Sequence, residues 1–236
     1  MTVTKTVKLA DGIEEYLAAV RPAGSGSAPS LEVGRLLADR NAGAIAMPRP
    51  AGMTVADTFI VHGGMETPVR IYRPASKPAS ALVYFHGGGF SAGSIETFDV
   101  LAAALSQASN TVVFSVGYRR LPEATPAEIY QEARRAYEWT CAHAKELQID
   151  ADNVGLAGDS AGAMIALQVA HAMNLAPSAL APKPVCLALF YGVFAVAMPS
   201  EDEFKLGDPV LVRPVLDAIV RTYHECNARA PGWVFD

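Results

Sequence analysis

Two glycine-rich segments, each following an apolar run, constrain the fold more than any other feature. HGGGF, at residues 86–90, follows the run ALVYF, and GDSAG, at residues 158–162, closes the run NVGLAG. The second segment leads directly into AMIALQVAHAM, an apolar stretch long enough for a helix. An apolar run, a sharp glycine turn and a helical stretch are typical of a strand that passes straight into a helix. The chain is therefore expected to belong to the α/β class.

GDSAG predicts an exposed serine. A strand that ends at Gly158 and a helix that begins near Ala161 leave Ser160 at the apex of the turn, with its hydroxyl clear of the backbone. Gly158 and Gly162 flank this apex and lack the Cβ atoms that would collide in so tight a bend. The amide of Ala161 is the expected donor to negative charge beside Ser160, because it lies at the positive end of the helix. A merely structural turn is the alternative.

HGGGF predicts further amide donors. Successive glycines let the backbone pass close to a bound carbonyl group, and Gly88 and Gly89 supply the expected amides. A simple connecting loop is the alternative for this segment alone, but its pairing with the serine turn argues against it. His86 belongs to the loop whose glycines must be positioned. We therefore assign it a hydrogen-bonding role that orients the loop, and not the role of general base.

Six apolar runs and three helical patterns alternate through the middle of the chain. The expected strands are 58–62, 69–74, 81–86, 111–118, 153–158 and 185–192. The expected helices are 97–109, 126–147 and 161–173, and Pro126 suits the first turn of its helix. This alternation predicts crossover connections, and hence a mostly parallel sheet with helices on both faces.

The chain divides into three expected parts. Residues 1–50 are rich in Ala, Gly and Pro and predict a helical arm with helices at 12–20 and 30–40. Residues 51–192 form the α/β core. Residues 193–236 predict a loop at 199–208 and an amphipathic helix at 209–226.

Composition narrows the function classes. A chain of 236 residues with 51% hydrophobic content can bury one large core, and a net charge of −5 with scattered basic residues argues against a nucleic-acid partner. The longest apolar run, 185–198, is too short to cross a bilayer. Three widely spaced cysteines fit neither a disulfide framework nor a zinc site, so a cytoplasmic location is expected. No motif for a metal or a cofactor is present, and none is expected.

The chain resembles the hormone-sensitive-lipase-like esterases of the α/β-hydrolase superfamily in three segments that follow the family's order. These are HGGGF at 86–90, GYRRLPEATPAEIYQEARRAYEW at 117–139 and ELQIDADNVGLAGDSAGA at 146–163. The likeness covers about residues 58–192. Within it, residues 117–124 resemble the family's Y-R-L-A-P-E signature, from which Arg120 and Leu121 depart.

The resemblance implies an α/β-hydrolase fold and a serine hydrolase that cleaves short-chain carboxylic esters. Ser160 would be the nucleophile, and Gly88, Gly89 and Ala161 would form the oxyanion hole. A helical cap would be built from the N-terminal arm and from residues 193–230.

The family's pattern also implies a catalytic acid after a seventh strand and a histidine after an eighth, and neither strand is visible after residue 192. The residues considered in their place are His171, Asp202, Asp208, Asp217, His224 and Asp236. His171 lies eleven residues beyond Ser160, ~16 Å along a helix and outside hydrogen-bond reach. His224 lies on the expected helix 209–226, where a surface histidine is the simpler interpretation. The triad acid and base are therefore unknown.

Three expectations follow from this departure. The chain would be a C-terminally truncated member of the family that lacks the last two strands, and its turnover would be impaired. The run 185–192 would form an edge strand, which exposes unpaired backbone groups and favours self-association. An alternative function is a non-catalytic hydrolase-fold protein that binds a small molecule or a partner.

Overall fold

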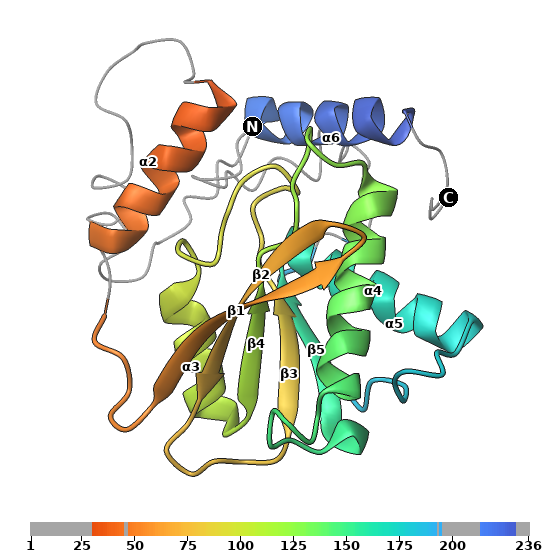
Figure 1. Cartoon of the computed structure of the whole chain (residues 1–236). Coiled ribbons are helices and arrows are strands. Elements are labelled where there is room, and N and C mark those ends of the chain that lie inside the picture. Colours follow the sequence, from red (N-terminus) through yellow and green to blue (C-terminus); the bar gives the residue numbers. More distant parts are fainter. Residues whose placement is uncertain (1–29, 45–46, 193, 195–212, 230–236) are drawn as a thin grey trace, which may run out of the picture.

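The computed structural model describes residues 30–44, 47–192, 194 and 213–229, and its described strands form one six-stranded sheet (Figure 1). The expected helix at 12–20 and the expected loop at 199–208 lie outside the described residues. So do three of the carboxylates considered for the triad, Asp202, Asp208 and Asp236.

The sheet is mixed, with its parallel part in the middle and at one edge. Its strands are β1 (Thr54–His62), β2 (Met65–Arg73), β3 (Ala81–Phe85), β4 (Val112–Val116), β5 (Val154–Asp159) and β6 (Leu187–Phe190). They lie in the order β1-β2-β4-β3-β5-β6. The pairs β2·β4 and β1·β2 are antiparallel, and the other three pairs are parallel. The α/β class and the order of the six strands along the chain are as predicted.

The first two strands are longer than predicted. They pair along their whole length, from Thr54 opposite Arg73 to His62 opposite Met65. Gly63 and Gly64 form the two-residue turn with φ of +58° and +79°, a left-handed conformation that suits a tight hairpin. The predicted runs 58–62 and 69–74 cover the second half of each strand, and the residues missed at the start of each strand, 54–57 and 65–68, include the polar residues Thr54, Asp57, Glu66 and Thr67.

The helices are α2 (Leu31–Ala44), α3 (Asp99–Ser109), α4 (Pro126–Ala142), α5 (Ala161–Leu175) and α6 (Arg213–Asn227), with a 3₁₀ turn at Ala151–Asn153. Pro126 occupies the first turn of α4, as predicted. Thr125 caps this helix by accepting from the Glu128 amide, while the Glu128 carboxylate accepts from the Thr125 amide. The helix ends at Ala142 and not at 147, because the chain turns back there to enter β5.

Side chains alternate between the two faces of the sheet. On β3, Val83 and Phe85 pack with α4 and α5 in the larger core, whereas Leu82 and Tyr84 pack with α3 in the smaller one. The helices therefore cover both faces, as predicted, and the central strands are buried along their whole length.

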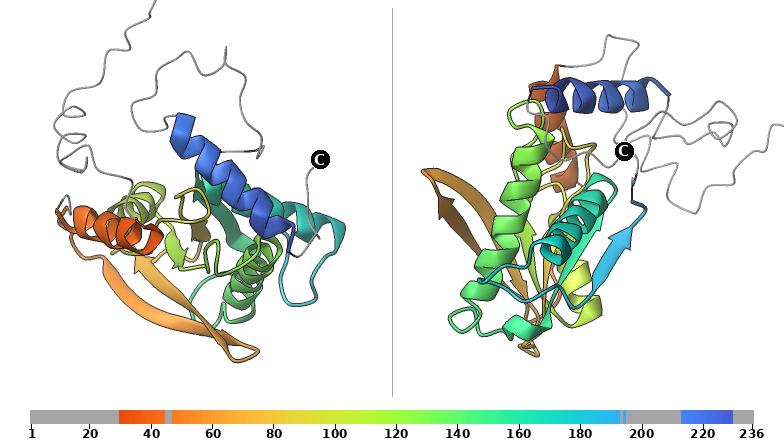
Figure 2. Two further views of the ribbon diagram at one scale, coloured as in Figure 1. Left: turned by 90° about the horizontal axis from the view of Figure 1, so that it is seen from above. Right: turned by 90° about the vertical axis from the view of Figure 1, so that its right-hand side faces the viewer.

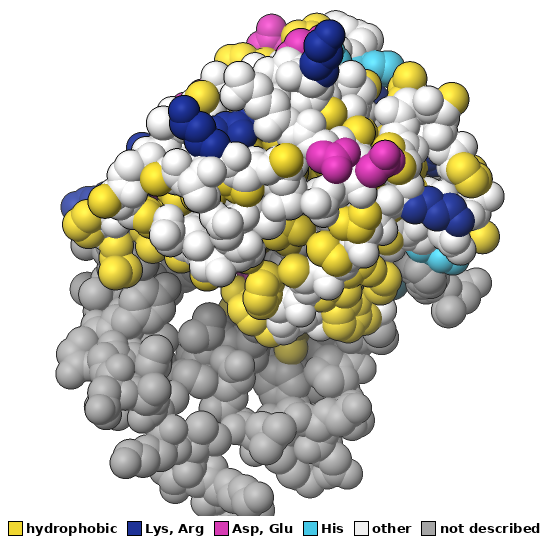
Figure 3. All heavy atoms as spheres, turned by 90° about the horizontal axis from the view of Figure 1, so that it is seen from below, with side chains coloured by type: hydrophobic (Ala, Val, Ile, Leu, Met, Phe, Trp, Pro, Cys, Tyr) yellow, Lys and Arg dark blue, Asp and Glu magenta, His cyan; other side chains and the backbone are white. Residues whose placement is uncertain are grey.

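Two helices lie beyond the carboxyl ends of the parallel strands. Seen from above, α6 crosses the molecule and α2 lies to one side of it (Figure 2). The opposite, lower face shows Lys and Arg side chains spread among hydrophobic ones (Figure 3). Among the described residues, no helix is long and apolar enough to cross a membrane.

Candidate active site

Ser160 stands at a strained turn between β5 and α5. Its backbone has φ of +50° and ψ of −120°, a conformation that residues other than glycine rarely adopt. Gly162 makes the turn possible, because a Cβ there would overlap the carbonyl oxygen of Phe85. A Cβ at Gly158 would likewise collide with the backbone of Gly162. Both positions therefore exclude a Cβ atom because the backbone packs closely there, as the sequence predicts.

The strain at Ser160 is held in place by hydrogen bonds on either side. The Ser160 amide donates to the carbonyl oxygen of Phe190, the last residue of β6, at 2.9 Å, and the Ser160 carbonyl accepts from the Ala163 amide at 3.1 Å. The residue is half-buried, and it opens the helix that begins at Ala161. Ser160 thus lies between β5 and the N-terminal end of α5, at the turn that the sequence predicts.

The glycine loop, defined here as residues 86–94, lies directly against this turn. A Cβ at Gly87 would stand 3.1 Å from the Ser160 Cβ. Gly88 and Gly89 have φ of +117° and +59°, and Phe90 follows with φ of +61°. Within the described part of the chain, the amides of Gly88 and Gly89 donate to no other group, whereas the carbonyl of Gly88 accepts from Ser91 and Ala92. The loop thus keeps amides available at the position where the sequence predicts an oxyanion hole.

A buried carboxylate next to the serine ties the two segments together. Asp159 is 2% exposed and accepts from the Gly87 amide at 2.9 Å, the Tyr84 hydroxyl at 2.5 Å and the Tyr191 hydroxyl at 3.2 Å. Burial raises the pKa of Asp159, against the lowering effect of these hydrogen bonds. Its contacts fix the glycine loop to the strand that carries Ser160. Sequence reasoning did not assign Asp159 this role, although its place inside GDSAG was a signal.

His86 is lodged beneath the loop. It is 1% exposed, its ring stacks on Tyr118 at 4.4 Å and on Phe98 at 5.6 Å, and its Nδ1 lies 2.8 Å from the Gly87 carbonyl oxygen. Burial lowers the pKa of His86 to about 4, so the ring is neutral at pH 7. This position suits the predicted loop-orienting role.

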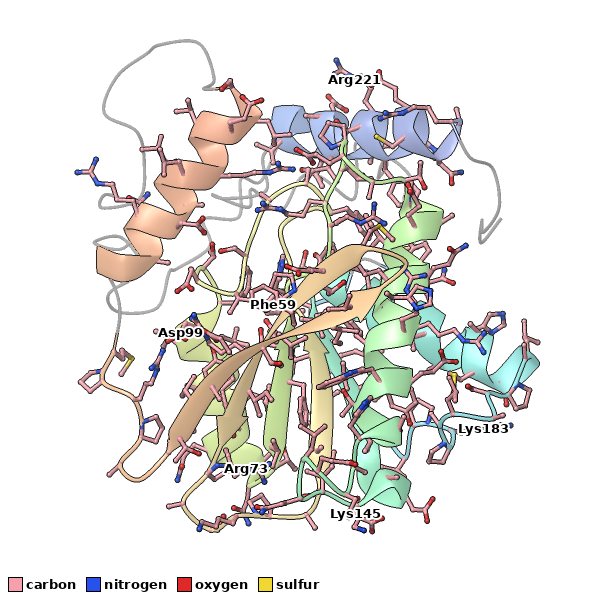
Figure 4. The ribbon with its side chains drawn as sticks, viewed as in Figure 1. Phe59, Arg73, Asp99, Lys145, Lys183 and Arg221 are labelled. Atoms are coloured by element: carbon pink, nitrogen blue, oxygen red, sulfur yellow. The ribbon has the colours of Figure 1, made fainter. Side chains whose placement is uncertain are left out.

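Helix α6 covers the glycine loop. A Cβ at Gly89 would stand 2.7 Å from the Ile219 Cδ1, so this side chain lies directly over the loop. Tyr223 packs against Phe90 with ring centroids 5.1 Å apart, and its hydroxyl lies 2.9 Å from that of Tyr130 on α4. Arg221 projects from the other side of the helix, away from the sheet (Figure 4). The helix predicted after the sixth strand therefore covers the glycine loop beside Ser160.

All five histidines of the chain lie in the described residues, and none is a hydrogen-bond partner of the Ser160 hydroxyl there. His171 is exposed near the end of α5, and His224 is exposed on α6. His62 ends β1, and His143 follows α4 at the opposite end of the sheet, stacked on a tryptophan ring. The described hydrogen bonds therefore identify no histidine as the triad base, which the sequence also leaves unknown. No group of described residues could hold a metal ion.

Comparison with known proteins gives a consistent result. A family model described as the α/β-hydrolase fold matches residues 82–234. The ethyl acetate hydrolase of Pseudomonas putida is 36% identical over 130 residues, which is 53% of this chain and 41% of that protein. The carboxylesterase NlhH of Mycobacterium tuberculosis is 33% identical over 176 residues, which is 72% of this chain and 54% of that protein.

A solved structure shows the same fold. The hyperthermophilic esterase of Pyrobaculum calidifontis superimposes with a TM-score of 0.80 at 24% identity, over 92% of this chain and 71% of that one. The chain spans about half the length of these two curated relatives.

Proposed function

Since this chain belongs to the hormone-sensitive-lipase-like carboxylesterase family of α/β-hydrolases, we propose that it is a serine esterase acting on short-chain carboxylic esters. The single observation that carries this proposal is the placement of Ser160, which is strained at the N-terminus of α5 with the glycine loop packed against it. Relatives named for the hydrolysis of ethyl acetate and of carboxylic esters support the choice of substrate class.

The proposed reaction uses an acyl-enzyme. The Ser160 hydroxyl attacks the ester carbonyl carbon, and the carbonyl oxygen becomes an oxyanion. The amides of Gly88, Gly89 and Ala161 donate to this oxygen, whose charge exists only in the transition state and the tetrahedral intermediate. Collapse expels the alcohol and leaves the acyl group on Ser160, and water then releases the acid. His86 orients the loop through its contact with Gly87.

We further propose that this chain alone turns over slowly. Among the described residues, no hydrogen bond joins a histidine to the Ser160 hydroxyl, and His224 stays a weak candidate because it is exposed on α6. In a related serine-hydrolase mechanism, removal of the base costs on the order of a million-fold in kcat, and the oxyanion hole and binding provide what remains. The same observation favours the alternative of a non-catalytic small-molecule-binding protein, which the experiment below distinguishes.

The test measures hydrolysis of p-nitrophenyl acetate and butyrate by the wild type and by Ser160→Ala, His224→Ala and His143→Ala. His143→Ala is the matched control, because His143 lies at the far end of the sheet from Ser160. We expect Ser160→Ala to abolish the enzyme-dependent rate and both histidine variants to keep it. Equal rates in wild type and Ser160→Ala would refute the esterase. A loss in both Ser160→Ala and His224→Ala, with His143→Ala unaffected, would instead assign the base to His224.

Mass spectrometry of the intact chain after exposure to a fluorophosphonate separates a slow enzyme from a binding protein. One phosphonyl adduct on Ser160, absent from Ser160→Ala, is expected if the serine is nucleophilic. If the wild type carries no adduct and hydrolyses no ester, but calorimetry shows that it binds a short-chain ester, the binding protein is the correct description.

The remaining proposals concern organisation and surroundings. We propose a helical cap from residues 1–50 and about 193–230 over a core at 51–192, supported by the positions of α2 and α6 above the strand ends. We propose a cytoplasmic location because all three cysteines are free, one of them exposed.

Self-association through β6 is also proposed. Within the described sheet, β6 pairs on one side only, with β5, and Leu187 and Phe190 on it are 41% and 40% exposed. Light scattering coupled to size-exclusion chromatography is expected to show dimers or larger species. A stable monomer at high concentration would contradict this proposal.

A further inference from the structure

The carbonyl groups of the glycine loop are occupied along nearly its whole length. The carbonyl oxygens of His86, Gly87, Gly88, Phe90, Ser91 and Gly93 all accept hydrogen bonds or lie within hydrogen-bond distance of a donor. Because the amide and the carbonyl of one peptide group point in opposite directions, binding the carbonyls on one side directs the amides to the other. The amide of Gly89 shares its peptide group with the Gly88 carbonyl, which accepts from the amides of Ser91 and Ala92. Side chains that hold the loop at Ser91 and beyond therefore act on the Gly89 amide through these two hydrogen bonds.

Arg35, on α2, is one of these donors. Its Nε donates to the Ser91 carbonyl at 2.7 Å, and its Nη2 donates to the Leu121 carbonyl at 2.6 Å. The same guanidinium meets the Glu123 carboxylate at 2.6 and 2.9 Å. Its side chain is only 12% exposed, so these hydrogen bonds form in a partly desolvated position where they are stronger than on the open surface.

Asp39, one turn further along α2, holds the end of the same loop. Its Oδ1 accepts from the Ser94 hydroxyl at 2.5 Å and from the Thr97 hydroxyl at 2.6 Å. Arg35 and Asp39 are four residues apart and so lie on one face of the helix. That face of α2 therefore hydrogen-bonds to the glycine loop at two residues, Ser91 and Ser94.

Arg120 is the third side chain at this place, and it occupies one of the two positions that depart from the family's Y-R-L-A-P-E signature. Its Nη1 donates to the Gly93 carbonyl at 2.5 Å. Burial lowers the pKa of Arg120, with the neighbouring positive charge of Arg35 as a further cause, but arginine remains charged at any ordinary pH. A leucine at this position could not donate to the loop.

We propose that Arg35, Asp39 and Arg120 form a clasp that sets the position of the oxyanion-hole amides, so that the activity of Ser160 depends on the docking of α2. This inference rests on the proposed function. The clasp residues touch neither substrate nor reacting atoms and act through the loop, which makes them positioning residues. Helix α2 is then a part of the catalytic apparatus and not only a wall of the substrate pocket.

The clasp predicts a particular kinetic signature. A displaced amide weakens an interaction that is strongest in the transition state, so kcat falls while KM changes little. Removing an oxyanion-hole donor outright costs about 10²–10³-fold in kcat, and displacing it should cost a part of this. We expect about tenfold losses of kcat for Arg35→Gln and Arg120→Gln, with KM within about twofold of the wild type.

Two further variants separate positioning from stability and from charge. Arg40→Gln removes the same charge from an exposed position of the same helix and is expected to keep the wild-type kcat. Arg35→Lys keeps the charge but loses the planar fork that reaches two carbonyls, and it is expected to resemble Arg35→Gln. A wild-type kcat in both Arg35 variants would overturn the clasp, as would an equal loss in Arg40→Gln.

Hydrogen exchange tests the clasp without any need for activity. The amides of Gly87, Ser91 and Ala92 are hydrogen-bonded within the folded loop, so a peptide covering 85–98 should exchange slowly in the wild type and in Arg40→Gln. Faster exchange of this peptide in Arg35→Gln, with the β5 peptide unchanged, is expected. Unchanged exchange would refute the clasp. If the wild type hydrolyses no ester, the proposed function fails, while this measurement still decides the clasp.

Discussion

Replacement of Gly162 by alanine tests the packing that makes the serine turn possible. A Cβ at this position would overlap the Phe85 carbonyl oxygen and stand 2.6 Å from the Phe85 carbonyl carbon and 2.7 Å from the His86 carbonyl oxygen. Ordinary contact begins at 3.4 Å, so the backbone of β3 or of α5 would have to move by roughly 0.8 Å at its closest carbon. All three contacts are to backbone, which cannot rotate away as a side chain can.

Two effects of opposite sign decide the magnitude. Alanine favours a helix over glycine by about 1 kcal/mol, whereas overpacking of a buried site costs about 3 kcal/mol at the upper end of its usual range. The cost of overpacking should exceed the gain in helix propensity, so Gly162→Ala should lower the free energy of unfolding by about 2 kcal/mol. Gly34→Ala is the matched control, since Gly34 is also helical and a Cβ there would meet nothing within 4 Å. Its stability should stay equal or rise.

Urea unfolding followed by circular dichroism measures the difference. With a slope of about 2 kcal/mol/M, a loss of about 2 kcal/mol lowers the midpoint by about 1 M. A midpoint for Gly162→Ala equal to or above the wild-type value would show that the backbone yields easily and would refute the packing argument for this turn.

Three other predictions follow from buried polar groups. Tyr130→Phe should cost about 1–2 kcal/mol in urea unfolding because it leaves the buried Tyr223 hydroxyl without its partner at 2.9 Å, and adding Tyr223→Phe should cost less than a second equal loss. Because burial lowers the pKa of His86 from 6.5 to about 4, its contribution to stability is present above pH 6.5 and is lost as the pH falls towards 4. Unfolding at pH 7 and pH 5 should therefore differ by about 2 kcal/mol more in the wild type than in His86→Gln. Arg70→Gln should cost about 1 kcal/mol, since Arg70 meets three carboxylates at 2.7–3.0 Å, and the loss should shrink in 1 M salt.

The ion-pair group around Arg70 also shows how the outer hairpin is joined to the body of the protein. Asp99, at the start of α3, accepts from Arg70 and from the hydroxyl of Tyr72 at 2.7 Å, beside the β1–β2 hairpin that bears Phe59 (Figure 4). The hairpin is thus joined to the body by this ion-pair group and also by hydrophobic contacts, since Val55 and Tyr72 pack in the smaller core.

The central strands and the serine turn could be predicted because their signals are local. Ser160 and its flanking glycines occupy five consecutive residues, and the buried strands are continuous apolar runs. The clasp could not be predicted in this way, because Arg35 and its acceptor Ser91 are 56 residues apart. No periodic pattern links a helix to a loop across such a separation. The contacts of Asp159 were hidden for the same reason, since its partners Tyr84, Gly87 and Tyr191 lie 75, 72 and 32 residues away.

Helix α6 illustrates an intermediate case. Its amphipathic pattern predicted a helix at 209–226, and the structure describes one at Arg213–Asn227. The sequence did not reveal that Ile219 would rest on Gly89 or that Tyr223 would pack on Phe90. Such contacts depend on where the connecting segment places the helix, which side-chain periodicity does not encode.

The hydrogen bond from the Ser160 amide to the Phe190 carbonyl joins the proposed nucleophile to the last residue of β6. A chain added to the outer edge of β6 would lie only two strand spacings from β5, about 10 Å. The Phe190 carbonyl would then lie next to the subunit contact and also hold the Ser160 amide. A shift of β6 on association would therefore move Ser160 without any contact to substrate. Quaternary state becomes a variable that kinetic measurements on this protein need to hold constant.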